Sequence, residues 1–473
     1  MLWIGALALL LGMAGVASAL PAVLALGALA GVTALLLAAI FAPGRLGGLL
    51  YFAAVATAAF PLDKYFAYQD HVGGWPGMRV ALSDLLMVLL AGLALLGWLL
   101  DRPRARLPAA LCVPYALLLV QYCGSALGAP HRDLAAFEIA AAVHALAVAA
   151  VVAALFRRQY LGAVMAGLSV MVLLHTALAA VQVATGRPIG AGLLRHHADV
   201  MQELLETGSV RLRPSGLFDH PIIFADFVML SLPVLAVGAL TLPRRLGRVA
   251  CAGVLLIGVL GMVLTLSRGA WISSVVTAVV FLSLAVRVRL LELRTLRRVG
   301  VAAALVVLLA AIPLGPKIVE RFTQSQAGNF EVRVELNRIA LSMVEAHPVF
   351  GVGLNNFLSV LSAYDPKDVA RTFPATVHNI YLLEASEAGI PGLLLFLATG
   401  AGLLFWTVRR LPLISDPPLR WLALAVLSGL IGFAVSQLAD FSHRLEPLRT
   451  FLWTLVGLMV GAVRVGLAKK EQG

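Results

Sequence analysis

His378 and Asn379 lie where a long polar segment meets a long apolar run, and both have side chains that suit chemistry at a membrane surface. An imidazole with a pKa near neutrality can remove a proton from an attacking hydroxyl. An asparagine at such a place can instead cap the free backbone N–H groups of a helix. The pair therefore has two interpretations, a catalytic base with its neighbour and a simple helix start.

Arginines flank other apolar runs of the chain. Arg211 and Arg213 precede one run, and Arg268 lies in a tight turn between two others. Guanidinium groups bind phosphate oxygens through paired hydrogen bonds and stay charged at any relevant pH. The alternative is that Arg268 reaches out to lipid phosphates and that an exposed loop simply tolerates Arg211 and Arg213. If these segments converge with His378, they predict a site that stabilises a pyrophosphate leaving group.

Metal-ligand spacing is not found near these segments. The carboxylates of Asp219 and Glu384 are isolated in the sequence, and no His-x-x-x-His pair accompanies them. A displacement at a pyrophosphate would then use arginines where many enzymes use a metal ion. The sequence predicts neither a metal nor a cofactor.

The composition is that of a membrane protein. Hydrophobic residues make up 61% of the 473 residues and charged residues only 13%, and the mean hydropathy is +0.94. The apolar runs are continuous rather than alternating, which predicts helices and not barrel strands. The net charge of +12 comes from arginines in short loops, which is the positive-inside pattern and not a nucleic-acid-binding surface.

The sequence therefore predicts an all-α polytopic membrane protein with about 12–14 transmembrane helices. A span of about 20 apolar residues per helix places the helices at residues 2–19, 21–41, 47–61, 80–100, 107–128, 134–156, 160–182, 217–242, 249–266, 269–287, 299–315, 379–408, 420–439 and 448–467.

Basic clusters fix the predicted orientation, because an even number of predicted helices separates each cluster from the next. The clusters contain Arg102, Arg104 and Arg106; Arg157 and Arg158; Arg244, Arg245 and Arg248; residues 287–298; Arg409, Arg410 and Arg420; and Arg464, Lys469 and Lys470. Short basic loops favour the cytoplasm, so both termini are predicted to be cytoplasmic. The segments with His378, Arg213 and Arg268 then face the opposite side. So does the long segment of about residues 316–378.

Part of that long segment has apolar residues at helical spacing. Between residues 330 and 349 an apolar stripe is interleaved with charged residues, including Arg333. This pattern predicts an amphipathic helix lying along the membrane surface.

The motifs resemble those of the O-antigen ligase and polymerase superfamily. They are Arg213-Pro-Ser-Gly216, Ser267-Arg268-Gly269, Gly351-Val-Gly353-Leu-Asn355-Asn-Phe357, His378-Asn379 and Gly389-Ile-Pro-Gly392. Their order, with a long extracytoplasmic loop ahead of the His-Asn pair, makes the resemblance fairly specific. It covers roughly residues 211–396, and the predicted helix count exceeds the usual twelve of the family by about two.

The resemblance implies a metal-independent, inverting glycosyltransferase of the bacterial inner membrane. Such an enzyme moves a glycan from undecaprenyl pyrophosphate to an acceptor sugar on the periplasmic face. By this analogy His378 is the base and Arg213, Arg268 and Arg211 hold the pyrophosphate, while Asn379 and Arg333 support them. The resemblance also divides the chain into N-terminal helices (1–210), a core (211–408) with the periplasmic loop 316–378, and C-terminal helices (409–473).

The motifs do not identify the acceptor. The complete set of motifs slightly favours a ligase acting on lipid A core over a polymerase joining lipid-linked repeat units, and some relatives transfer to protein. A different class, a carrier or flippase for lipid-linked glycans, would need polar groups midway through its helices. Most polar residues gather at one face instead, with Gln437 and Asp440 as the nearest exception.

Overall fold

The structure, a computed structural model, is a bundle of membrane-spanning helices. It describes residues 43–69, 71, 73–101, 107–187, 189, 202–204, 210–292, 294, 327–368 and 375–468. Within these residues, nine helical segments are long and apolar enough to cross a membrane, which confirms the predicted all-α polytopic fold. The helices predicted at 2–19, 21–41 and 299–315 lie outside the described residues.

The described elements follow one another in a simple order. They are α3 (Pro43–Ala58), β1 (Asp63–Phe66), β2 (Met78–Ala81), α4 (Leu82–Asp101), α5 (Ala109–Gly128), α6 (Arg132–Leu155), α7 (Leu161–Thr185), β3 (Gln202–Leu204), β4 (Val210–Leu212), α9 (Pro221–Thr241), α10 (Arg245–Leu264), α11 (Arg268–Arg287), α13 (Ala327–Ala346), α14 (Phe357–Val360), α16 (Ile380–Arg410), α17 (Pro417–Ser436) and α18 (Leu448–Ala468). A short 3-10 turn, η5 (Ser442–Arg444), joins α17 to α18.

Most predicted boundaries agree with these elements to within about four residues, and prolines account for two of the shifts. The helix predicted at 217–242 begins at Pro221, where the side chain of His220 caps it. The helix predicted at 420–439 begins three residues earlier, because Asp416 caps it and Pro417 occupies its first position. Proline is favoured at the first helical position because its missing N–H is not needed there.

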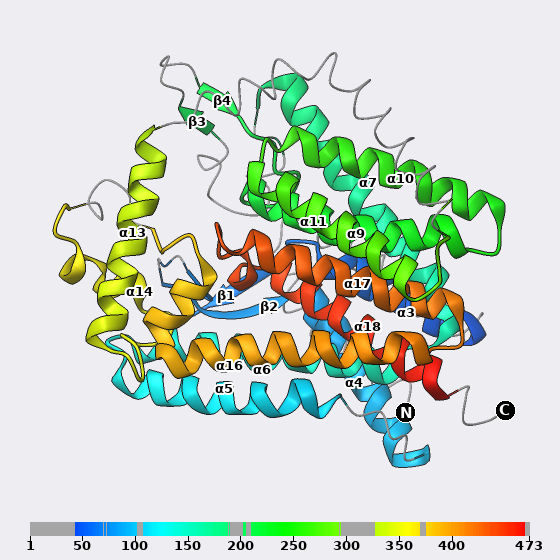
Figure 1. Ribbon diagram of the computed structural model, residues 1–473, viewed down its shortest axis with the longest axis horizontal. Coiled ribbons are helices and arrows are strands. Elements are labelled where there is room, and N and C mark those ends of the chain that lie inside the picture. The colour runs from blue at the N-terminus through cyan, green and yellow to red at the C-terminus, as the bar shows by residue number, and fades with distance from the viewer. Residues whose placement is uncertain are drawn as a thin grey trace.

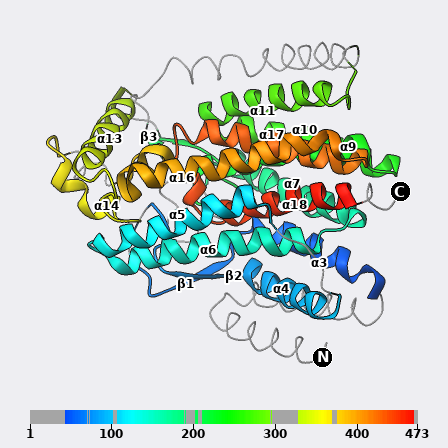
Figure 2. The same ribbon diagram turned by 60° about the horizontal axis from the view of Figure 1, so that its bottom comes forward.

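Three helices form the centre of the bundle. In α9, α17 and α18, 78%, 72% and 83% of the apolar window is buried, against 28% in α5, α10, α11 and α16. Helix α16 packs along α5, and α18 packs along α6. The spanning helices run roughly parallel, with α13 and α14 at one end of the bundle and the C terminus at the other (Figures 1 and 2). The N-terminal, core and C-terminal parts of the chain therefore interleave.

The motifs lie at the same end of the bundle as α13. The turns from α5 to α6, from α10 to α11 and from α17 to α18 are here, together with the starts of α9 and α16. The described arginines of the short basic loops lie at the opposite end, between α9 and α10 and between α16 and α17. The helix order thus separates the motifs from these basic clusters, as the parity of the sequence predicts.

Helix α13 is the predicted amphipathic helix, but its apolar side faces protein. Leu336, Ile339, Ala340 and Met343 are at most 1% exposed and pack on a cluster from α14, the start of α16 and the α17–α18 turn. This side therefore faces protein and not lipid, and the position of the helix along the membrane surface stays a prediction. The apolar spacing indicates that one side of the helix is buried, but it does not show whether protein or lipid packs against that side.

Helix α16 bends at Gly389, which has φ 76° inside the helix. Pro391, two residues later, has no N–H to donate to the carbonyl of Glu387. The segment before α14 docks on the opened backbone: Val352 N donates to Ser386 O (2.8 Å) and Gly353 N to Glu387 O (3.3 Å). The two glycine-containing motifs thus form one joint.

Gly389→Ala tests this joint. A Cβ at Gly389 would lie 2.2 Å from Val349 O, and the positive φ would cost a further 1–3 kcal/mol or so. We expect a clear decrease in the melting temperature of the purified protein in detergent. The control is Gly400→Ala on the same helix, where a Cβ meets nothing within 4 Å and the melting temperature should not decrease. Equal melting temperatures of the two variants would contradict a structural role of Gly389 in the joint.

Candidate active site

The α17–α18 turn fixes the position of His378. Ile380 N, two residues later, donates to both Gln437 O (3.1 Å) and Asp440 O (3.0 Å) of that turn. Asn379 caps α16, and its side-chain oxygen accepts from Tyr381 N and Leu382 N at 3.0 and 3.2 Å. Asn379 therefore has the helix-cap role, and it holds the preceding histidine at the mouth of the helix.

The imidazole of His378 is held in one orientation. Its Nδ1 lies 3.1 Å from Thr376 O, and its ring meets the edge of Phe441 with 5.5 Å between centroids. A carbonyl only accepts, so Nδ1 carries the proton and Nε2 has the lone pair in the neutral ring. Burial and the charge of Arg333 lower the pKa of His378 to about 4. The ring is therefore neutral and able to accept a proton at physiological pH.

The predicted arginines come from three separate elements. Arg213 Nε donates to Thr265 O (3.2 Å) in the α10–α11 turn, three residues before Arg268, which is the first residue of α11. Arg333 of α13 donates from Nη1 to Ala439 O (3.1 Å) in the α17–α18 turn. Each arginine is thus tied to, or belongs to, a turn at the end of the bundle where His378 lies.

Electrostatic interactions agree with these positions. The positive charge of Arg333 lowers the pKa of His378, and the positive charge of Arg268 lowers the pKa of Arg333. Burial, with the charges of Arg213, His378 and Arg333, lowers the pKa of His220 to about 3. Arg213, Arg268, Arg333 and His378 therefore share one region at the end of the bundle. Arg211 lies in β4 as the register partner of Glu203 in β3, and its contact with a phosphate stays a prediction.

Asp440 is a further member of this region that the sequence did not assign. It is 7% exposed, one carboxylate oxygen accepts from Phe441 N (2.8 Å), and the other is buried without a hydrogen-bond partner. Burial raises the pKa of Asp440 to about 6, although Phe441 N and the charges of Arg333 and Arg213 act in the opposite direction. The sequence feature that could have pointed to Asp440 is the position of an ionisable residue at the end of an apolar run.

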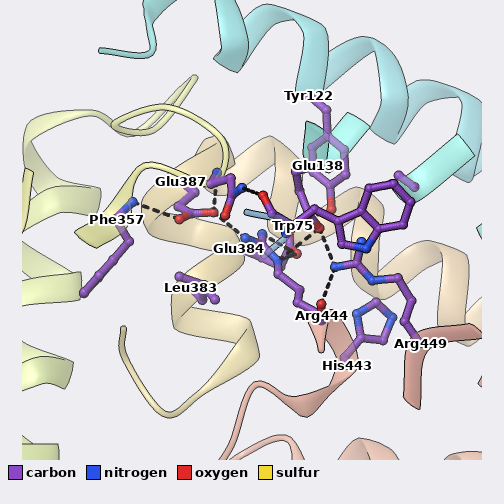
Figure 3. Close-up of polar contacts among 12 residues, drawn as sticks. Trp75, Tyr122, Glu138, Phe357, Leu383, Glu384, Glu387, His443, Arg444 and Arg449 are labelled. Atoms are coloured by element: carbon purple, nitrogen blue, oxygen red, sulfur yellow. Dashed lines mark hydrogen bonds and ion pairs between the residues drawn. The ribbon is translucent and has the colours of Figure 1, made fainter. Parts of the chain in front are cut away.

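A buried ion network lies behind this region. Arg444 of η5 contacts Glu384 (2.7 Å) and Glu387 of α16, and all three are only 1% exposed. Arg449 of α18 contacts Glu138 of α6 (2.7 Å), as Figure 3 shows. Burial opposes the charge, but the carboxylates of Glu384, Glu387 and Glu138 raise the pKa of Arg444 above its ordinary value. The network joins α6, α16, α18 and the α17–α18 turn.

Reading Glu384 as an isolated carboxylate was therefore wrong. Glu384 and Glu387 are three residues apart on α16, which puts both on one helix face, and Arg444 reaches them from sixty residues away. The sequence signal was the Glu-x-x-Glu spacing inside an apolar run. Its partner could not be identified because Arg444 looks like any arginine of a short turn.

The same network holds the motif ahead of α14. The carboxylate of Glu387 accepts from Asn355 N (2.8 Å) and Phe357 N (2.9 Å). The Asn355 side chain donates to Trp75 O and Leu134 O, each at 3.1 Å, and its oxygen lies 2.8 Å from His71 Nε2. Asn355 has a positive φ of 56° and is fully buried. This motif therefore joins elements and supports the site from behind.

Metal ligands are not gathered at this end of the described chain. In the residues that the structure describes, no group of three His, Cys, Asp or Glu side chains is placed to hold a metal ion. The guanidiniums of Arg213, Arg268 and Arg333 lie at this end among the described residues.

Comparison with known families agrees with this geometry. Residues 252–397 match the family model described as O-antigen ligase. This match supports the resemblance of the chain to the O-antigen ligase and polymerase superfamily. The matched region, a little under a third of the chain, contains Arg268, Arg333, His378 and both glycine-containing motifs. Residues 252–397 are therefore similar to this family, and comparison with curated proteins gives no match.

Arg444→Met tests the buried ion network. The substitution leaves two carboxylates buried without their cation, which typically costs about 3–5 kcal/mol. We expect a large decrease in melting temperature in detergent. Combining it with Glu384→Gln and Glu387→Gln should recover part of the loss, because the orphaned groups are then neutral.

The control is Arg338→Met on α13, whose side chain is exposed to solvent and whose partner Glu335 keeps a second cation, Lys367. Surface pairs contribute little to stability, so this variant should melt close to the unchanged protein. Similar losses in Arg444→Met and Arg338→Met would contradict a special role of the buried network.

Proposed function

We propose that the protein is a bacterial inner-membrane glycosyltransferase that moves a glycan from undecaprenyl pyrophosphate to an acceptor sugar hydroxyl on the periplasmic face. The observation that carries the proposal is that Arg213, Arg268 and Arg333 contact or belong to turns at the end of the bundle where His378 lies. The preferred acceptor is lipid A core, which makes the enzyme an O-antigen ligase. A polymerase that joins lipid-linked repeat units is the alternative.

The reaction is a single displacement at the anomeric carbon of the donor. His378 Nε2 takes the proton from the acceptor hydroxyl, whose oxygen forms the new glycosidic bond. The bond from the anomeric carbon to the pyrophosphate oxygen breaks on the opposite face, which inverts the configuration. Undecaprenyl pyrophosphate leaves with the bonding electron pair, and the proton on His378 passes to solvent.

The arginines supply the electrostatic part of this mechanism. Arg213 and Arg268, with Arg211 beside them, bind the pyrophosphate and stabilise the negative charge that develops as it leaves. Positive charges held close together repel one another, and a bound anion relieves that repulsion. Arg333 supports the base by keeping His378 neutral before reaction, and its charge favours release of the proton afterwards. No metal enters the proposed steps.

The sidedness of the proposal follows from charge. The arginines between α9 and α10 and between α16 and α17 lie at the end of the bundle away from His378. Short basic loops favour the cytoplasm. With that end cytoplasmic, both termini are cytoplasmic and the site opens to the periplasm, where lipid-linked glycans are joined to their acceptors.

The buried carboxylates favour an enzyme over a carrier. Glu138, Glu384, Glu387 and Asp226 all lie within the first eight residues of their helices, at the end that holds His378. A carrier would need polar groups spaced along a path across the bilayer. The positions of these carboxylates instead support a fixed site at one membrane surface.

His378→Ala is the direct test of the enzyme. Purified protein in detergent is mixed with a lipid-linked glycan and lipid A core, in the presence of a chelator, and the product is followed by gel shift. Loss of a general base should reduce the rate about 100- to 10,000-fold. Arg338→Ala, on the exposed side of α13, is the control and should retain activity. Undiminished transfer by His378→Ala would remove the base, and chelator-sensitive transfer would remove the metal-independent mechanism.

The pH profile tests the role of Arg333. In the unchanged enzyme kcat/KM should stay level with falling pH until His378 becomes protonated near its pKa of about 4. Arg333→Gln removes a nearby positive charge, which raises the pKa of His378, so kcat/KM should begin to fall at a higher pH. The exposed Arg338→Gln should leave the profile unchanged. An acid limb that does not move in Arg333→Gln would show that Arg333 does not set the state of the base.

A further inference from the structure

A cavity of about 380 Å³ lies inside the bundle between two pairs of helices. Helices α5 and α16 form one wall, and α17 and α18 form much of the other. Helix α16 packs closely on α5 but touches α17 and α18 only slightly. The cavity is therefore a gap left by the packing of α16, and its volume falls within the range of small-molecule sites.

The two ends of the cavity differ in polarity. Leu111, Leu403 and Val456 line the end deep in the bundle, whereas Arg444 and Arg449 line the end near the α17–α18 turn. The helix directions place the polar end on the same side of the bundle as His378. A molecule with an apolar chain and a polar head would match this gradient, with its head toward the membrane surface.

The cavity also reaches the outer surface of the bundle. Leu397 is 43% exposed, and Gly400, Ala401 and Ala434 are exposed too, although all four line the cavity. A Cβ added at Gly400 would meet nothing within 4 Å. These residues lie on membrane-spanning helices, so the opening between α16 and α17 faces the lipid and admits a chain from the side.

The polar end contains buried groups that lack partners. Arg449 is 2% exposed and its Nε has no hydrogen-bond partner, and neither has Nδ1 of His443. A buried polar atom without a partner is costly. Arg449 Nε can only donate and suits an oxygen atom of a ligand, whereas His443 Nδ1 can donate or accept and suits a hydroxyl. Glu138 and Glu384 lie at the same end, and their negative charge disfavours a phosphate there. A neutral hydroxyl or ester oxygen fits best.

We propose that this cavity binds an oxygen-bearing acyl chain of the lipid acceptor, with the chain between α16 and α17 and a hydroxyl or ester oxygen at Arg449 and His443. The assignment to the acceptor rests on the proposed transferase function. Gln437 lines the cavity, and its carbonyl holds Ile380 N, two residues after His378. The head of a lipid bound here emerges beside the proposed base, whereas the phosphates of the donor need the arginine region.

Photolabelling tests the cavity independently of activity. The purified protein in detergent is irradiated with a 3-hydroxyacyl methyl ester that has a diazirine at its chain end, and in parallel with a diazirine-bearing alkane of equal length. Labelled peptides are mapped by mass spectrometry. The ester should label α16, α17 and α18 at lower concentration than the alkane. Equal labelling by both probes would overturn the assignment of the oxygen site.

Gly400→Trp tests the lateral opening, because the new side chain would fill it. We expect labelling of these helices to decrease about tenfold, which corresponds to about 1.4 kcal/mol. The control is Gly253→Trp on α10, where a Cβ also meets nothing within 4 Å and which does not line the cavity. Labelling that Gly400→Trp leaves unchanged would overturn the cavity site.

Transfer kinetics then separate the two proposals. Gly400→Trp should raise the KM for lipid A core and leave kcat nearly unchanged, while Gly253→Trp changes neither. An unchanged KM in Gly400→Trp would overturn the assignment to the acceptor. Labelling sensitive to Gly400→Trp in a protein that transfers no glycan would support the cavity as a lipid site and overturn the proposed transferase function.

Discussion

The buried guanidinium of Arg444 is the constraint around which the end of the bundle with His378 is arranged. A charge removed from water this completely is tolerated only when opposite charges surround it at hydrogen-bonding distance. Those charges are Glu384 and Glu387 of α16, with Glu138 of α6 nearby. Because Arg444 lies in the turn whose carbonyls hold Ile380 N, the same ion pairs that neutralise it also set where α16 begins. The position of His378 is a consequence.

The backbone joint at Gly389 adds a second constraint on the same helix. A proline and a glycine free the carbonyls of Ser386 and Glu387 from the helix, and the segment before α14 supplies the missing donors. The Glu387 side chain then caps that segment from the other side. Two of the motifs that carry the resemblance to the superfamily therefore contain no reactive group. Their glycines allow two backbones to approach, and the result is a joint that supports the helix beginning after His378 and Asn379.

Much of this arrangement was predictable from local patterns. Hydropathy located the described spanning helices because continuous apolar runs need no knowledge of their neighbours, and charge parity placed Arg213, Arg268 and His378 at one end. The pairing of Arg444 with Glu384 and the approach of Asp440 to Arg333 were not predictable. Such contacts join turns and helices far apart along the chain, and neither partner has a sequence pattern that names the other. The packing of α13 against α14, α16 and the α17–α18 turn could not be predicted for the same reason.

These constraints produce two groups of charged side chains that differ in net charge. In the inner network, carboxylates and guanidiniums neutralise one another in the bundle, and little capacity remains for an ionic ligand. In the outer region, the guanidiniums of Arg213, Arg268 and Arg333 lie near the neutral imidazole of His378 and the single carboxylate of Asp440, so an anion is favoured over a cation. The cavity between α16 and α17 ends against the inner network and therefore suits an uncharged chain. In the proposed reaction, the donor phosphates would bind in the outer region and the acceptor lipid in the cavity, so the two substrates would occupy separate places.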